Sequence, residues 1–185
     1  LAKVTGSPEG NEKEQLEKFQ ELFYSSLKYR TKSDVPLGAF LSGGLDSTAI
    51  CTGLTQIGES VSSFNIGFEE EKYDESVYAK KVAKHLGLDH SMHKMNVSDL
   101  LNEKDFLFNH FDEPFSVSSV FPTYKVSNLA KKNISVALSG DGGDELFGGY
   151  DRYYGHKYAG YYAMIPRFIR QYGIGGILNQ IPDGG

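Results

Sequence analysis

The sequence has a single cysteine, no long apolar run and no block of basic residues. One cysteine, Cys51, excludes an internal disulfide and fits a reducing cytoplasm, which is the location we expect. No apolar run approaches the roughly 18 residues of a membrane span, and no signal-peptide pattern opens the chain, so we expect no membrane partner. The net charge of −5 argues against nucleic acid as a partner.

The length and composition of the chain are those of a globular domain. The chain has 185 residues, of which 39% are hydrophobic and 23% are charged, and a chain of this length can bury a core. It begins with Leu1 rather than Met, and residues 181–185 read as an unsupported end, so we expect a piece of a longer protein. We expect a linker at 1–11, a main domain at 12–155 and a truncated helical region at 156–185.

An apolar run at 37–41 stops in a Ser-Gly-Gly turn and is followed by a segment with helical periodicity. The run suits a buried strand, and the segment that follows places Ile50, Leu54 and Ile57 at helical spacing. Such a junction points several backbone N–H groups and the positive end of a helix dipole at one spot. Gly43 allows a close approach that a side chain would block. The stretch therefore predicts a site for a phosphate or pyrophosphate.

Strands and helices alternate along the rest of the chain. Apolar residues at helical spacing predict helices at 12–30, at 74–86, from residue 98 onward and at about 123–132. Asp74 and Ser98 are the expected N-caps, and Gly87 is the expected C-cap. Short apolar segments predict further strands at 60–68, 89–95 and 134–138. This order predicts an α/β fold, a doubly wound parallel sheet with helices on both faces, whose ligands bind beyond the carboxyl ends of the strands.

A second glycine-rich turn follows the strand at 134–138. Because both turns lie at the carboxyl ends of predicted strands, they can face the same ligand-binding crevice. Its acidic residues are Asp141, Asp144 and Glu145. Carboxylates do not attract phosphates by themselves, but a magnesium ion between Asp46 in the first turn and an acid of the second turn would join the two. One of these acids could also act as a general base, while Glu145 more readily complements a helix N-terminus.

The two turns carry a family resemblance. The first has no lysine after its glycines, so it is neither a GxxxxGK[ST] P-loop nor a GxGxxG turn. Ser42 to Ser47 instead resembles the PP-loop, SGGxDS, of the ATP pyrophosphatases. Residues 138–150 resemble the LSGxGxDExFxGY segment of the synthetase domain of the asparagine synthase family. The resemblance runs from about residue 12 to 155 and implies the fold of the PP-loop, adenine-nucleotide alpha-hydrolase-like proteins.

The resemblance implies an activity as well. In this family a substrate carboxylate attacks the α-phosphate of magnesium ATP, which forms an acyl-adenylate and releases pyrophosphate, and ammonia then displaces AMP to give an amide. An N-terminal glutaminase domain supplies the ammonia, and residues 1–11 are where it would be attached. We therefore expect the 185 residues alone to be inactive. A homodimer is compatible with the resemblance.

Site residues follow from the same resemblance. The expected contacts with ATP are Leu41, Ser42, Gly43, Gly44, Asp46, Ser47, Ile66, Ser139 and Gly140. The expected magnesium ligands are Asp46 and Asp144, and the expected catalytic residue is Asp141, at a position implicated in deprotonating the incoming nitrogen.

Two departures from the family pattern leave the substrate open. Asparagine synthetases proper usually have Glu where this chain has Asp141, and residues 112–118 lack the Thr and Arg expected of an aspartate-using enzyme. Aspartate and other acids, including sugar acids of surface polysaccharides, are therefore equal alternatives. Adenylation of a urea-like oxygen and a non-catalytic nucleotide-binding module are further alternatives. Six tyrosines lie between residues 150 and 162, several of them three or four positions apart. This spacing predicts a helix that packs its aromatics into a core or against a missing C-terminal region, rather than a surface for nucleic acid.

Overall fold

The structure is a computed structural model that describes residues 10–111 and 119–170. The chain divides after Asp141 into two compact units, Leu1–Asp141 and Gly142–Gly185. Residues 112–118, whose departure from the family pattern is noted above, lie outside the described residues. The first unit contains both glycine turns up to Asp141, so most of the predicted site can be examined within it.

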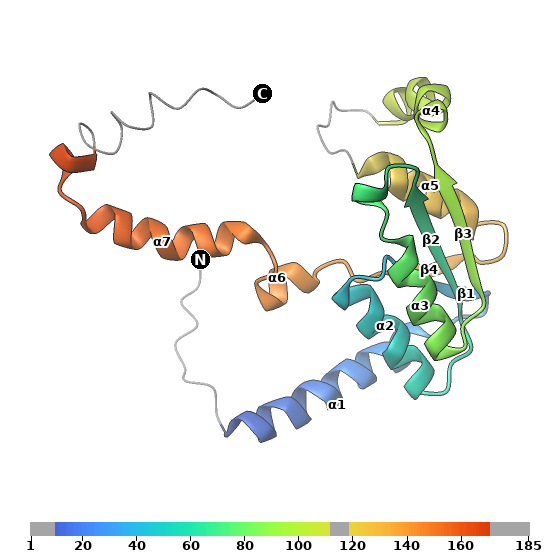
Figure 1. The fold of residues 1–185 in the computed structure, drawn as a ribbon. Coiled ribbons are helices and arrows are strands. Elements are labelled where there is room, and N and C mark those ends of the chain that lie inside the picture. The colour runs from blue at the N-terminus through green and yellow to red at the C-terminus, as the bar shows by residue number, and fades with distance from the viewer. Residues whose placement is uncertain (1–9, 112–118, 171–185) are drawn as a thin grey trace. The chain divides into compact units, whose positions relative to one another are not determined.

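The first unit is built on a four-stranded parallel sheet (Figure 1). Its strands are β1 (Leu37–Phe40), β2 (Ser62–Phe68), β3 (His90–Met95) and β4 (Val136–Leu138), in the spatial order β3-β2-β1-β4. The register aligns Ala39 of β1 with Ser63 of β2 and with Leu138 of β4. Each strand begins within two residues of its predicted start, and the sheet is parallel throughout, as predicted.

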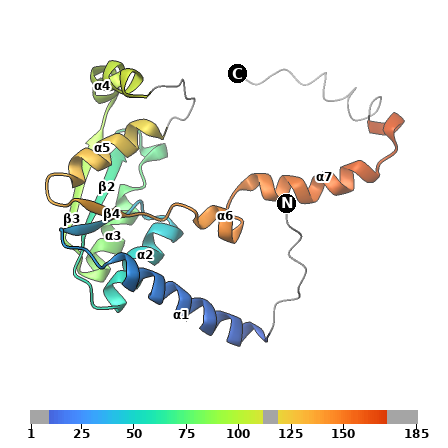
Figure 2. The same ribbon diagram turned by 180° about the vertical axis from the view of Figure 1, so that it is seen from behind.

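Helices connect the strands and cover both faces of the sheet. Helix α1 (Glu12–Arg30) precedes β1, α2 (Leu45–Gln56) joins β1 to β2, and α3 (Ser76–Leu86) joins β2 to β3 after the short η1 (Glu71–Tyr73). Helices α4 (Val97–His110) and α5 (Val120–Ala130) lie between β3 and β4 in the sequence. In the reverse view α5 lies in front of the sheet with α2 and α3 behind it (Figure 2), which confirms the doubly wound architecture.

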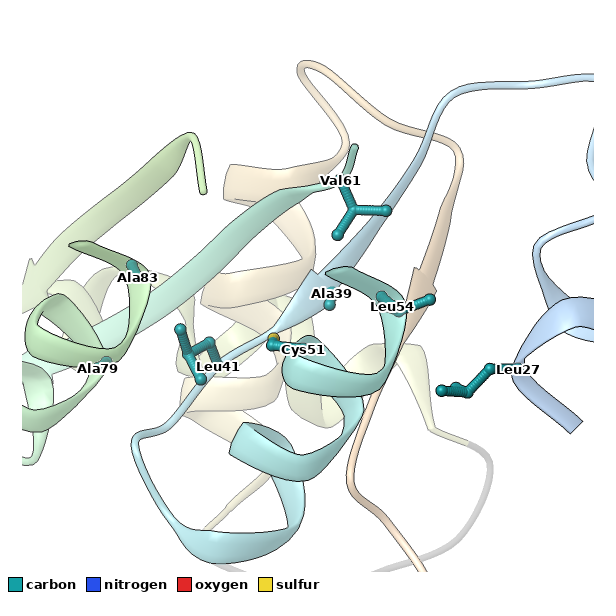
Figure 3. Close-up of a cluster of buried hydrophobic side chains, with 8 residues drawn as sticks. All are labelled: Leu27, Ala39, Leu41, Cys51, Leu54, Val61, Ala79 and Ala83. Carbon is teal, nitrogen blue, oxygen red and sulfur yellow. The ribbon is translucent and has the colours of Figure 1, made fainter. Parts of the chain in front are cut away.

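A hydrophobic core fills the space between β1 and the three helices α1 to α3 (Figure 3). Ala39 of β1 and Leu41, directly after the strand, reach this core, because alternate residues of an extended chain point to the same face. Cys51 and Leu54 meet them from α2, and Leu27 from α1; all five side chains are at most 2% exposed. Burial also raises the pKa of the Cys51 thiol to about 11. This core fixes the direction in which α2 leaves the glycine turn.

A second core lies between the sheet and α5. Phe64, Ala130 and Ile134 are its buried residues, and Phe40 packs against them from β1. An added Cβ on Gly38 would lie 3.0 Å from the Phe64 ring and 2.8 Å from Ile134, so glycine allows these side chains to close on the strand. The two cores together hold β1 from both faces, which is what the continuous apolar run at 37–41 predicted.

Helix ends follow the predicted signals in part. Gly87 adopts the left-handed conformation, φ 68°, at the C-cap of α3, as predicted. The expected N-caps were wrong by one or two residues: α3 has Glu75 at its N-cap rather than Asp74, and α4 has Asn96 rather than Ser98. The Asn96 side chain accepts the N–H of Asp99, and the Asp99 carboxylate accepts the N–H of Asn96, so this capping box outcompetes the serine.

The second unit contains α6 (Gly143–Phe147) and α7 (Asp151–Met164). Helix α7 carries the predicted tyrosines, but Tyr154, Tyr158 and Tyr161 are all more than 60% exposed. These three rings therefore do not pack into a core among the described residues, and packing against a C-terminal region stays a prediction. No helix within residues 10–111 and 119–170 is long and apolar enough to cross a membrane.

Candidate functional site

The candidate site lies at the carboxyl ends of β1 and β4, where the order of the strands reverses. From β1 the chain moves outward to β2 and β3 on one side, and then returns to place β4 on the other side of β1. The carboxyl ends of β1 and β4 therefore lie side by side at this reversal. In open parallel sheets this switch point forms the crevice in which ligands bind. Both predicted glycine turns begin here.

The turn after β1 is held by the hydroxyl groups of two serines. The backbone N–H of Ser42 donates to Ser47 Oγ at 3.2 Å, and the N–H of Gly44 donates to Ser42 Oγ at 3.2 Å. The two hydroxyl oxygens lie 2.9 Å apart, and Ser47 Oγ donates to the carbonyl of Gly44 at 3.2 Å. The hydroxyls thus bond within the turn, and they give it a fixed shape before any ligand binds.

Backbone donors gather where this turn enters α2. The first intrahelical hydrogen bond runs from the N–H of Thr48 to the carbonyl of Gly44 at 3.1 Å, so the amides of residues 45 to 47 precede the helical ladder. No side chain caps α2 among the described residues. Asp46, half-buried, lies in this first turn of the helix. The arrangement offers an anion several N–H groups and the positive end of the α2 dipole, next to one carboxylate.

Gly43 brings the turn against the start of α3. Its φ is +90°, a conformation that favours glycine. An added Cβ would lie 2.6 Å from the backbone nitrogen of Ala79 and 2.8 Å from Tyr78 Cβ. Glycine is therefore required at this position both by its backbone angle and by close packing against α3.

The turn after β4 meets the turn after β1 at Gly140. A Cβ added to Gly140 would lie 2.7 Å from the Ser47 nitrogen and 2.9 Å from the Asp46 carbonyl carbon. The two predicted motifs therefore touch through their backbones at this point. Beside the contact, the Ser139 hydroxyl donates to Asp141 Oδ2 at 2.8 Å, which orients the exposed Asp141 carboxylate.

The remaining acids of the second turn belong to the second unit. The Tyr150 hydroxyl donates to Glu145 Oε1 at 2.7 Å, and this hydrogen bond lowers the pKa of Glu145 and raises that of Tyr150. Glu145 thus has a structural partner of its own. Asp144 lies one residue earlier in α6, and its pairing with Asp46 through magnesium stays a prediction.

A pocket of about 240 Å³ opens beside the first turn, at the carboxyl ends of β1 and β2. Its walls are mainly apolar, and among them are Phe40, Phe64, Ile66, Phe68 and Val126. Leu41 and Ser42 lie at the end nearest the turn, so two expected ATP contacts and Ile66 line one cavity. The Leu41 side chain is itself fully buried in the first core, which leaves its backbone to border the pocket.

The described residues contain no group of three or more His, Cys, Asp or Glu side chains that could hold a metal ion. Magnesium does not need such a cage, because it keeps several waters and usually takes one or two carboxylates together with phosphate oxygens. Asp46, a single carboxylate beside a set of N–H donors, therefore fits a magnesium ion that arrives with a nucleotide.

Comparison with known proteins identifies the family of the chain. The family model described as asparagine synthase matches residues 18–177. The chain belongs to the asparagine synthase family. It is 40% identical over 165 residues to a putative glutamine-hydrolysing asparagine synthetase of Methanocaldococcus jannaschii, a match that covers 88% of this chain and 32% of the relative. It is 38% identical over 152 residues to asparagine synthetase 1 of Bacillus subtilis, covering 82% and 24%. The chain thus spans about a quarter to a third of these relatives.

The fold has a counterpart among solved structures. An NH3-dependent NAD synthetase from Campylobacter jejuni superposes with a TM-score of 0.51 at 16% identity, over 72% of this chain and 60% of that chain. At this identity the likeness concerns the fold alone, and it confirms the expected doubly wound α/β architecture.

Two polar residues at the pocket of this asparagine synthase family member, Asn65 and Glu75, were not predicted from the sequence. Asn65 is 5% exposed, and its Nδ2 donates to the Leu41 carbonyl at 2.8 Å, so it ties β2 to the start of the turn. Asn65 Oδ1 is buried without a hydrogen-bond partner among the described residues. A polar residue inside the apolar strand 62–68 was the available signal, since a buried amide requires a partner.

Proposed function

We propose that this chain is the ATP-binding part of an amide-forming synthetase, which adenylates a substrate carboxylate and transfers ammonia to it. The observation that carries the proposal is the contact of Gly140 with Asp46 and Ser47, which joins the two motifs of the family at the switch point of the sheet. Backbone N–H donors on the first turn and the Asp141 carboxylate on the second suit cleavage between the α and β phosphates.

The β and γ phosphates of ATP would lie on the turn after β1. The amides of residues 45 to 47 and the α2 dipole would supply N–H donors and partial positive charge. Gly43 and Gly44 would allow the pyrophosphate to approach the backbone. Ser42 and Ser47 would contribute mainly by holding the turn through their mutual hydrogen bonds. On the Gly140 side, the Ser139–Gly140 backbone would border the α-phosphate.

Magnesium would be held by Asp46, with Asp144 as the proposed second ligand, and when bound it neutralises charge on the departing pyrophosphate. The adenine would occupy the apolar pocket beside Ile66, with the backbone of Leu41 at its edge. Base and phosphates would then lie on either side of Ser42, which borders both the pocket and the turn.

Asp141 is the proposed base for the incoming nitrogen. Its carboxylate is exposed and is oriented by the Ser139 hydroxyl, so it is available to a nucleophile that enters after adenylation. Because aspartate has a shorter side chain than the glutamate usual at this position, the acyl group would have to lie closer to the turn after β4. Aspartate and other carboxylic acids therefore both remain candidate substrates.

The ammonia would come from glutamine. The two relatives compared above, from Methanocaldococcus jannaschii and Bacillus subtilis, are named as glutamine-hydrolysing asparagine synthetases, and this chain spans only part of their length. We propose that residues 1–11 link to an N-terminal glutaminase domain, that residues 12–155 form the ATP-binding domain and that 156–185 begin a C-terminal helical region. The 185 residues alone would then lack synthetase activity.

The test is pyrophosphate release from magnesium ATP by the complete natural polypeptide, with ammonia and a series of acids that includes aspartate and uronic acids. We expect one acid to stimulate release. The Asp46→Asn variant should lower this rate at least roughly 100-fold, because it removes a carboxylate that acts on the transferring phosphates. Asp105→Asn is the matched control, since Asp105 is an exposed acid of α4 outside the pocket.

Three outcomes would count against the proposal. Unchanged turnover in Asp46→Asn would refute the phosphate assignment. Binding of ATP without stimulation by any acid would favour a non-catalytic nucleotide-binding module. An Asp141→Asn variant that binds ATP and forms amide at the normal rate would leave Asp141 without a catalytic role.

A further inference from the structure

The nucleotide pocket and the phosphate-binding turn meet at the start of α3. Glu75, the N-cap residue of this helix, lines the pocket together with Ser42 and Ile66. The carbonyl of Glu75 accepts the N–H of Ala79 at 3.3 Å, and Ala79 is the residue against which Gly43 packs. Glu75 is therefore one helical turn from the phosphate-binding turn and also borders the pocket.

The backbone on both sides of Glu75 is fixed. The preceding Asp74 carboxylate accepts the N–H of Phe68 at 3.4 Å and that of Ser76 at 3.0 Å, and it pairs with Lys94 at 3.6 Å. Hydrogen bonds from Ser76 and Phe68, together with Lys94, hold the pKa of Asp74 below its usual value. These contacts join β2, β3 and α3, so they hold the backbone at Glu75 in place.

The Glu75 side chain takes no part in these contacts. It is exposed, and it forms no hydrogen bond or ion pair within the described part of the chain. An ionised carboxylate only accepts hydrogen bonds, and it repels phosphate oxygens. A nucleotide offers donors without negative charge at the amino group of its adenine and at the hydroxyls of its ribose. The ribose also connects the base to the phosphates, and Glu75 lies where the pocket adjoins the turn.

We propose that Glu75 recognises the ribose of the nucleotide, its carboxylate accepting hydrogen bonds from the sugar hydroxyls, and this rests on the function proposed above. An acidic residue that binds ribose hydroxyls beside a glycine turn is a known solution in other doubly wound folds. Glu75 is then a specificity-determining residue that selects ribonucleotides over deoxyribonucleotides. A hydrogen bond to a charged acceptor is stronger than a neutral one, which gives the selection a measurable size.

The experiment measures the affinity of the complete natural polypeptide for ATP, 2′-deoxyATP and 3′-deoxyATP by calorimetry with magnesium present. We expect ATP to bind at least roughly tenfold more tightly than one of the deoxy analogues. Glu75→Ala should weaken ATP binding by about the same factor and leave the analogue within about twofold, so that the discrimination is lost. Glu75→Gln keeps one acceptor oxygen and should fall between the two.

Glu70→Gln is the matched control, because Glu70 is an exposed acid that precedes η1 and does not line the pocket. It should keep both affinities and the discrimination. Equal weakening of ATP and both analogues in Glu75→Ala, or no weakening of any, would overturn the ribose assignment. A change in magnesium dependence with the discrimination intact would also overturn it and would make Glu75 part of the cation site.

Failure of the two proposals can be told apart. If the unmodified protein binds no ATP, the proposed function is wrong and the ribose assignment falls with it. If it binds ATP, Asp46→Asn abolishes the magnesium dependence and Glu75→Ala keeps the discrimination, only the ribose assignment is wrong. Thermal unfolding of each variant checks that it is folded. If Glu75→Ala does not fold, the affinities of Glu75→Gln provide the test.

Discussion

The contact of the two glycine turns predicts a large effect of one methyl group at Gly140. In Gly140→Ala the new Cβ would lie 2.7 Å from the Ser47 nitrogen, 2.9 Å from the Asp46 carbonyl carbon and 3.0 Å from Asp46 Cβ. Real Cβ atoms essentially never approach other heavy atoms within 3.0 Å. Two of the three obstructing atoms belong to the backbone, so a change of rotamer cannot relieve the overlap and the turns must separate.

The size of the effect follows from the cost of overpacking. Forcing a methyl group into a closely packed position costs about 1–3 kcal/mol, and every 1.4 kcal/mol corresponds to about a tenfold change in affinity. If separation of the turns carries this cost into binding, magnesium ATP should bind roughly 5- to 140-fold more weakly. Gly140 does not have a positive φ, so alanine suits its backbone and the effect would be steric. Calorimetric titration with ATP measures it.

Gly155→Ala is the control for this variant. Gly155 lies within α7, and no heavy atom lies within 4 Å of its added Cβ. Alanine should leave ATP affinity unchanged and should hold or raise the melting temperature, because glycine costs about 1 kcal/mol relative to alanine in a helix. If Gly140→Ala bound ATP within twofold of the unmodified protein, the argument from contact between the two turns would be refuted.

Three other variants test the supports of the site and of the fold. Asn65→Ala should lower stability by about 1–3 kcal/mol and weaken ATP binding, because it leaves the Leu41 carbonyl without its amide donor; denaturant unfolding and calorimetry measure the two effects. The N–H of Asn96, followed by Lys125 and His93, lowers the pKa of Asp99 from 3.8 to about 2. This carboxylate therefore stabilises the fold above pH 3.8 and loses its contribution as the pH falls toward 2, and Asp99→Asn should flatten that part of a stability–pH profile. The Cys51 thiol, buried and with a pKa of about 11, should react with a thiol reagent only as fast as the protein opens, and rapid labelling of the native protein would contradict its place in the core.

The sequence predicted the framework of the site because the framework depends on local signals. The apolar run at 37–41 ends at glycines, and residues 134–138 do the same, so both turns could be placed at strand ends. Parallel pairing then brings those ends to one edge of the sheet. Gly87 as a C-cap was predictable for the same reason, since a left-handed cap residue after an amphipathic helix is a local requirement.

Other features depend on contacts between distant segments and could not be predicted. The hydrogen bond from Asn65 to Leu41 joins residues 24 positions apart, and it exists only once β1 and β2 are paired. The position of Glu75 at the pocket depends in the same way on the packing of α3. The hydrogen bond between the hydroxyls of Ser42 and Ser47 could not be predicted either, because it exists only once the turn brings the two oxygens within 2.9 Å.

The strand order has a consequence for how the site comes into being. Ala39 and Leu138 are paired across β1 and β4, although they lie roughly 100 residues apart, and pairings of such long range close slowly during folding. Strands β1 to β3 lie earlier in the chain, so they can emerge from the ribosome and pair before β4 has been made. The anion-binding turn can therefore form early in synthesis, while the crevice beside it is completed only when β4 docks.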